Sequence, residues 1–280
     1  MNGGDQGTPK GFELIRAVLA RVIDHAEDSA ALEREKDQLR TERDRLDAEV
    51  RERETAERDL ADAQRRADSL RAQVPTRYRT ASLASWQLHG SAADQKIQRR
   101  VLNAALAYDA IFGERENPAA YFPQLTAFQG SPGTGKNHIA WSLVASAHVV
   151  HNASFVFCRA QDLVRDIRGA WATSTRDASD ESSSEARRVW RYRTTGLLVI
   201  DEVSRDKLTV DPTKHLYDVV ADREEWMRPT ILITNDEEGT FFKLIGDSLA
   251  DRLKGSSDLW NFGTRSFRPQ LRRPNAESDK

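Results

Sequence analysis

A glycine-rich run at residues 130–137, GSPGTGKN, constrains the fold of this 280-residue chain more than any other feature. It fits the G-x-x-x-x-G-K frame of a phosphate-binding loop at Gly130, Gly135 and Lys136. The motif requires a strand before the loop and a helix after it. The mostly apolar residues 125–128 and the helical pattern after the loop supply both. The run therefore predicts an α/β fold with a nucleotide site at the end of a strand.

The residue types in this loop suit a polyphosphate. Glycine lets the backbone wrap a phosphate with its N–H groups pointing inward, and the helix start adds anion affinity. Lys136 is expected to reach the β and γ phosphates of ATP. Asn137 stands where serine or threonine normally offers a hydroxyl to Mg²⁺, although an amide oxygen is also a competent ligand. The candidate nucleotide-binding residues are Gly130, Ser131, Pro132, Gly133, Thr134, Gly135, Lys136, Asn137 and His138.

Two further apolar runs end in polar side chains. Residues 197–202, LLVIDE, deliver two carboxylates to the end of a predicted strand, where α/β sites assemble. Asp201 is expected to hold Mg²⁺ together with Asn137, and Glu202 to polarise the attacking water. The run ILITN places Asn235 at the end of another strand, where its amide would position that water or, in a purely structural role, cap a helix.

The remaining pattern of this half alternates short apolar runs with helical segments. Besides 125–128 and 197–200, residues 154–158 and 231–234 read as buried strands, and residues 94–112 read as a helix. This alternation favours a parallel sheet with flanking helices. The polar stretch 173–184 is expected to form a mobile loop.

The N-terminal region has a different composition. Residues 12–26 have the spacing of an amphipathic helix, and more than half of residues 27–71 are charged, with no proline or glycine to interrupt a long helix before Pro75. A seven-residue stripe follows this helix and is apolar except at one position; it comprises Leu32, Leu39, Leu46, Arg53, Leu60, Ala67 and Val74. The companion positions are mostly polar, so only half of a coiled-coil seam is present. A solvated single helix, self-association and docking on a partner all remain open.

Composition excludes several classes of protein. The single cysteine, Cys158, excludes an internal disulfide framework, and no run approaches the length of apolar sequence that spans a bilayer. The first residues do not resemble a secretory signal. A net charge of −2 argues against a uniformly basic nucleic-acid binder. We therefore expect a cytoplasmic protein without a membrane partner.

Four blocks of this sequence resemble the motifs of AAA+ ATPases of the DnaC/IstB group, in particular DnaC-type replicative helicase loaders. The blocks are SPGTGKNHIA, LLVIDEV, DREEWMRPTILITN, and LADRL with the trailing DLWNFGTRSFR. The resemblance covers about residues 95–270 and implies a P-loop AAA+ domain that lacks a C-terminal helical lid. It implies that Lys136 and Asn137 contact the nucleotide and Mg²⁺, and that Asp201 and Glu202 form the Walker B motif. Asn235 would be the sensor 1 residue. Arg252 would be an arginine finger offered to a neighbouring subunit, and Arg268 would be a late arginine near the nucleotide. From the sequence chemistry alone, Arg252 is equally compatible with a surface arginine.

The resemblance also implies partners: a hexameric DnaB-like replicative helicase, single-stranded DNA and further copies of the chain. Its DNA contacts fall within residues 160–192, where arginines alternate with aromatic residues, namely Arg165, Arg168, Trp171, Arg187, Arg188, Trp190, Arg191 and Tyr192. The alternative is that the tryptophans are core residues and the arginines are solvated.

We expect a slow ATPase, stimulated by DNA or a partner, that loads or regulates the helicase during DNA replication. An IstB-like transposition helper and a nucleotide-gated coiled-coil scaffold with little hydrolysis are the alternatives. The expected organisation is a tail with a short amphipathic helix at 1–26, a long charged helix at 27–74, a linker at 75–95, the AAA+ domain at 96–270 and a disordered tail at 271–280.

Overall fold

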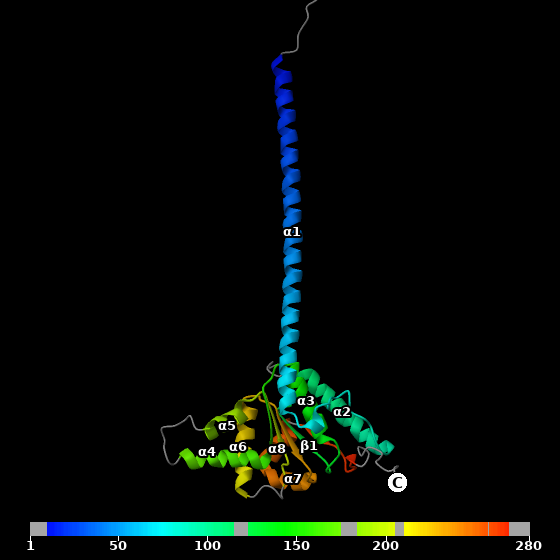
Figure 1. Cartoon of the computed structure of the whole chain (residues 1–280), viewed down its shortest axis with the longest axis vertical. Helices are drawn as coiled ribbons and strands as arrows, with labels where there is room; N and C mark the ends of the chain where they lie inside the picture. Colours follow the sequence, from blue (N-terminus) through cyan, green and yellow to red (C-terminus); the bar gives the residue numbers. More distant parts are fainter. Residues whose placement is uncertain (1–9, 115–122, 175–183, 205–209, 257, 269–280) are drawn as a thin grey trace, which may run out of the picture. The chain divides into compact units, whose positions relative to one another are not determined.

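The computed structural model describes residues 10–114, 123–174, 184–204, 210–256 and 258–268 (Figure 1). The chain divides into two compact units, residues 1–62 and residues 63–280, and each is described by itself. The expected tail at 271–280 and most of the expected loop at 173–184 lie outside the described residues.

Most of the first unit is helix α1, Lys10–Gln73, and the two predicted N-terminal segments form one continuous helix. Continuity follows from the absence of proline and glycine between residues 12 and 74. Exposed ion pairs one turn apart, such as Lys36 with Glu33 and Arg45 with Glu49, add a few tenths of a kcal/mol each. The helix ends just before Pro75, because the residue before a proline avoids the helical conformation.

The second unit begins with the last turns of α1. Leu70 and Val74 are buried in its core, and the Arg66 guanidinium donates to the Val149 carbonyl oxygen at 2.9 Å. The end of the long helix is therefore part of the core of the second unit.

A five-stranded parallel sheet forms the centre of the second unit. Its strands are β1 (Leu125–Gln129), β2 (Phe155–Arg159), β3 (Leu197–Asp201), β4 (Thr230–Thr234) and β5 (Asp258–Asn261). They lie in the order β2-β3-β4-β1-β5, and each neighbouring pair is parallel. The four predicted strands are confirmed. Strand β5 escaped prediction because two of its four residues are polar; Trp260 at its centre is buried and stacks on Phe128.

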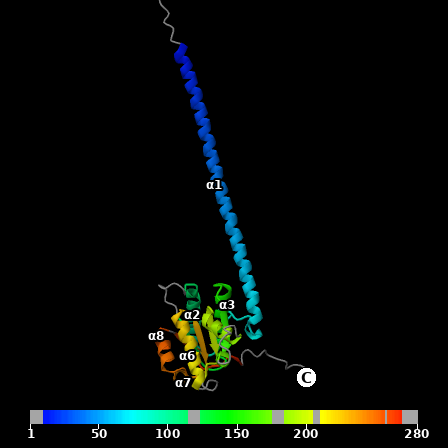
Figure 2. The ribbon, with the colours of Figure 1, turned by 90° about the vertical axis from the view of Figure 1, so that its left-hand side faces the viewer.

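Helices cover both faces of the sheet (Figure 2). On one face lie α2 (Ala92–Phe112) and α3 (Lys136–Val149) with the end of α1. On the other face lie α4 (Ala160–Ser174), α5 (Ser184–Thr194), α6 (Val210–Glu225), α7 (Glu238–Ile245) and α8 (Asp247–Ser256). Along β3, Leu197 and Val199 face the first group whereas Leu198 and Ile200 face the second, which explains the uninterrupted apolar run.

Candidate nucleotide site

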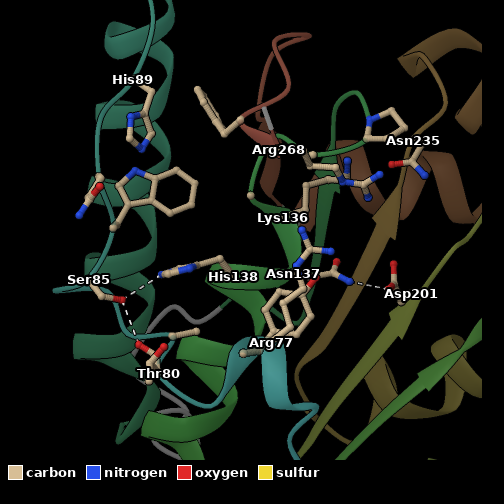
Figure 3. A pocket seen from close by; sticks show the side chains of 18 of the residues that line it. Arg77, Thr80, Ser85, His89, Lys136, Asn137, His138, Asp201, Asn235 and Arg268 are labelled. Atoms are coloured by element: carbon tan, nitrogen blue, oxygen red, sulfur yellow. Dashed lines mark hydrogen bonds between the residues drawn. The ribbon is translucent and has the colours of Figure 1, made fainter. Parts of the chain in front are cut away.

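The predicted motifs meet at the carboxyl edge of the sheet. The glycine loop follows β1, Asp201 ends β3, and Asn235 follows β4, which lies between those two strands. Together they line a pocket of about 520 Å³, into which Lys136, Asn137, Asp201, Asn235 and Arg268 project (Figure 3). This volume is within the range of small-molecule sites.

Two glycines of the loop accept no side chain. Gly133 has φ +86° and Gly135 has φ +97°, in the left-handed region that only glycine adopts readily. A Cβ on Gly133 would lie 2.2 Å from the Ser266 hydroxyl oxygen, and one on Gly135 would lie 2.5 Å from the Trp86 ring. The Thr134 hydroxyl donates to the Ser131 carbonyl oxygen at 2.9 Å and fixes the turn between them. The loop is a preformed cradle for an anion.

Lys136 begins helix α3 and is only 5% exposed. Its Nζ donates to the carbonyl oxygens of Gly130, at 2.5 Å, and Ser131, at 3.0 Å. Burial lowers the pKa of this ammonium to about 8; the Asp201 carboxylate opposes the shift and Arg268 adds to it. A poorly solvated cation at the bottom of an anion cradle is poised to gain a phosphate partner.

Asn137 and the two carboxylates at the end of β3 form a second group. The Asn137 amide nitrogen donates to Oδ2 of Asp201 at 2.8 Å, and the Glu202 backbone N–H donates to Oδ1 at 2.7 Å. Burial raises the pKa of Asp201, while these two hydrogen bonds act against the rise. Glu202 has φ +59°, which is strained for a residue with a side chain.

These residues fit a nucleotide with Mg²⁺. The loop backbone carries no Cβ at Gly133 and Gly135. Lys136 offers a cation, and Asp201 and Asn137 offer hard oxygen ligands. Among the described residues no three His, Cys, Asp or Glu side chains cluster as a metal site. One carboxylate and one amide oxygen suit Mg²⁺, which typically takes one or two protein ligands and completes its shell with phosphate and water.

One wall of the pocket comes from residues 75–95, the segment predicted to be a linker. The short 3-10 helix Thr76–Tyr78 and the residues after it line the pocket with Arg77, Tyr78, Trp86 and His89. The ring Nε2 of His138 lies 3.0 Å from the Ser82 carbonyl oxygen, and its imidazole meets Trp86 edge to face. Large aromatic and basic side chains among small polar residues were the only sequence signal for this wall.

The segment after β5 holds the loop from the opposite side. The Ser131 N–H donates to the Gly263 carbonyl oxygen at 3.0 Å, and the Phe267 N–H donates to the Gly133 carbonyl oxygen at 3.0 Å. Arg268 follows these contacts and lines the pocket. Arg252 belongs to helix α8, but its side chain lies outside the described residues.

The predicted DNA-contacting aromatics divide into different environments. Tyr192 is buried, and its hydroxyl donates to Asp166 at 2.7 Å, so this side chain belongs to the core. Trp190 is 68% exposed, whereas the side chain of Trp171 lies outside the described residues. Two arginines have acidic partners, Arg165 with Asp162 and Arg188 with Asp166.

A parallel sheet of this order, with a glycine loop after β1 and a carboxylate pair after β3, defines a P-loop ATPase-type domain. Comparison with known families makes the assignment specific, because the family described as IstB-like ATP binding protein matches residues 19–274. The chain belongs to this family of AAA+ ATP-binding proteins.

Individual relatives agree with this assignment. The chain is 27% identical over 176 residues to the replicative helicase loader DnaC of Buchnera aphidicola subsp. Schizaphis graminum, covering 62% of this chain and 66% of the relative. It is 26% identical over 145 residues to DnaC of Escherichia coli K12, covering 51% and 56%. The chain thus spans less than two thirds of these relatives. A crystal structure of the DnaC helicase loader shares the fold, with a TM-score of 0.54, 17% identity and coverage of 67% of this chain and 99% of that one.

None of the described helices is both long and apolar enough to cross a bilayer.

Proposed function

We propose that this protein hydrolyses ATP and uses the cycle to load or regulate a replicative DNA helicase on single-stranded DNA. The observation that carries the proposal is the convergence of Lys136, Asn137, Asp201 and Glu202 on one preformed pocket. The relatives named as replicative helicase loaders supply the cellular role.

Each residue has a role that its position suits. Lys136 and the loop N–H groups bind the phosphates, and Asn137 and Asp201 hold Mg²⁺. When bound, Mg²⁺ neutralises charge that develops on the transferred phosphate. Glu202 accepts the proton of the attacking water, and Asn235 orients that water. Arg268 adds positive charge at the nucleotide.

Further copies of the chain complete the site in this proposal. Arg252 serves as the finger that one subunit presents to the nucleotide of the next, so hydrolysis depends on assembly. The exposed Trp190 and the arginines of α5 contact single-stranded DNA, which would make turnover DNA-stimulated. A role on replicating DNA places the protein in the cytoplasm.

ATP turnover with and without single-stranded DNA tests the enzymatic part. We expect slow basal hydrolysis, stimulated by DNA, and its loss in Glu202→Gln with nucleotide binding retained. Lys136→Ala should lose binding as well. ATP that binds tightly but is never hydrolysed, under any DNA or partner condition, would instead establish a nucleotide-gated scaffold.

Co-purification with the replicative helicase of the same cell tests the loader part. The helicase should bind the full chain and should bind residues 63–280 more weakly, because α1 offers the exposed surface for docking. Equal binding of both forms would remove the docking role of α1.

A transposition helper is the second candidate, and the IstB-like description of the matching family favours it. The two candidates share the ATP site and differ in the client. Binding to a transposase, with no binding to the helicase, would replace the loader proposal while leaving the ATPase proposal intact.

A further inference from the structure

The apolar stripe of α1 has no cover in the first unit. Leu39, Leu46 and Leu60 are 64%, 51% and 71% exposed, and Val50 is 55% exposed. Seven-residue spacing keeps leucines on one side of a helix that pairs with another helix. The charges on either side of the stripe determine which kind of helix can pair with it.

In heptad positions a to g with Leu39 at d, the stripe is flanked by positions e and g. Described flanking side chains between residues 28 and 54 comprise six acids and one base, namely Asp28, Glu33, Arg40, Glu42, Asp47, Glu49 and Glu54. Some of these acids have a partner on α1 itself, for example Glu49 with Arg45. Asp28, Glu42 and Glu54 form no ion pair or hydrogen bond within the described part of the chain.

This charge pattern opposes pairing with a second copy. A parallel pair sets each g residue against the e residue five positions later in the partner. Three of the four pairs between residues 28 and 54 would then join acids, namely Asp28 with Glu33, Glu42 with Asp47, and Glu49 with Glu54, and only Glu35 with Arg40 would join opposite charges. An antiparallel pair sets e against e and g against g, which again brings acids together. Like charges across such a seam reject a partner, whereas opposite charges select one.

The a positions point the same way. Lys36 and Arg43 occupy two successive a positions, and in a parallel pair of copies each would meet its own equivalent. Both lean toward the e-position acids of α1, Lys36 to Glu33 at 2.8 Å and Arg43 to Asp47 at 3.7 Å, which leaves the leucine stripe uncovered.

We propose that the leucine stripe of α1 between residues 28 and 60 docks an amphipathic helix of another protein, with an apolar seam and lysine or arginine along both flanks. This inference goes beyond the loader proposal, because it specifies the chemistry of the docked helix whichever protein carries it. It also stands or falls independently of the ATP site.

Two synthetic helices test the proposal against the full-length protein. Both are about four heptads long with the same leucine stripe, and they differ only in carrying lysine or glutamate at e and g. We expect the lysine-flanked peptide to bind, in fluorescence anisotropy, at least about tenfold more tightly than the glutamate-flanked one. Rising salt should weaken that binding.

Charge-reversed variants locate the binding surface. Glu42→Lys with Glu54→Lys should weaken the lysine-flanked peptide and strengthen the glutamate-flanked one. Asp44→Lys with Glu52→Lys makes the same change in net charge at positions b and c, away from the stripe, and should leave the preference unchanged. Far-UV circular dichroism checks that the helix persists in each variant.

Three results would overturn the proposal. One is equal affinity for the two peptides, and another is binding to neither. The third would come from sedimentation of the full-length protein without nucleotide or DNA. It is a dimer that is lost in the double variant Leu39→Asp, Leu46→Asp. That outcome would assign the stripe to a second copy.

Discussion

At the scale of single residues, Lys136 links nucleotide binding to pH. Its pKa of about 8 lies below the ordinary 10.5 because burial disfavours the charged form, and a bound polyphosphate would raise it again. The affinity for ATP should therefore be highest below pH 8 and should fall as the pH rises through 8. Above that pH the unliganded Lys136 loses the proton that phosphate binding requires.

Calorimetry in buffers of different protonation enthalpy measures this linkage. At pH 8 we expect binding to take up about half a proton, and at pH 6.5 almost none. Proton release at pH 8, or an affinity that does not change between pH 7 and pH 9, would contradict the assignment of Lys136 to the phosphates.

Strain at Glu202 predicts a trade of stability for activity. Its φ of +59° costs roughly 1 kcal/mol or more for a residue with a side chain, and glycine adopts it freely. Glu202→Gly should therefore raise the free energy of unfolding by about 0.5–1 kcal/mol while abolishing hydrolysis. Glu202→Gln keeps the strain and serves as the matched control in urea denaturation. A destabilised glycine variant would show that no strain is stored there.

At the scale of elements, Arg223 joins three parts of the fold. It lies on α6, is fully buried, and donates to the carbonyl oxygens of Tyr192, Thr195 and Pro229 and to the Thr230 hydroxyl. No carboxylate of the described residues pairs with it, and burial lowers its pKa to about 9. The guanidinium thus ties the end of α5 to the starts of β3 and β4 through backbone carbonyl oxygens and one side-chain hydroxyl.

Arg223→Met should lower the free energy of unfolding by about 3–5 kcal/mol, because several buried carbonyl oxygens lose their donor together. Arg228→Ala is the control. Its guanidinium donates to the Arg193 carbonyl oxygen and lies 5.6 Å from the centre of the Trp226 ring, and both contacts are exposed, so its removal should cost about 1 kcal/mol. If urea denaturation shows that both variants lose the same free energy of unfolding, the buried hydrogen bonds of Arg223 do not hold these elements together.

At the scale of the whole molecule, the boundary between the units predicts which truncations are tolerated. Residues 63–280 retain Leu70, Val74 and the Arg66 contact to α3, whereas a chain that begins at residue 76 loses all three. The shorter chain should be less stable by about 3–5 kcal/mol, mainly from two lost apolar side chains. Thermal unfolding of 63–280 and 76–280 measures the difference, and equal midpoints would place the boundary nearer the predicted linker.

Much of this protein could be predicted from local sequence. Four of the five strands follow from residue periodicity. The meeting of Lys136, Asp201 and Asn235 follows from motif spacing, because parallel strands all end at one edge. Helical structure at 12–26 and 27–74 was also predictable, although not that the two segments form a single helix. Mixed charge without breakers likewise determines a long helix.

Tertiary structure alone decided the rest. The pocket wall around Trp86, the strand β5, the burial of Tyr192 and the role of Arg223 depend on contacts between residues far apart in the chain. Short segments of mixed polarity carry no period of their own, so their conformation is set by the neighbours that bury them. The eight residues of the glycine loop predict a nucleotide site by themselves. The segments that enclose that site can be assigned only from the tertiary structure, because contacts between distant residues bring them to the loop.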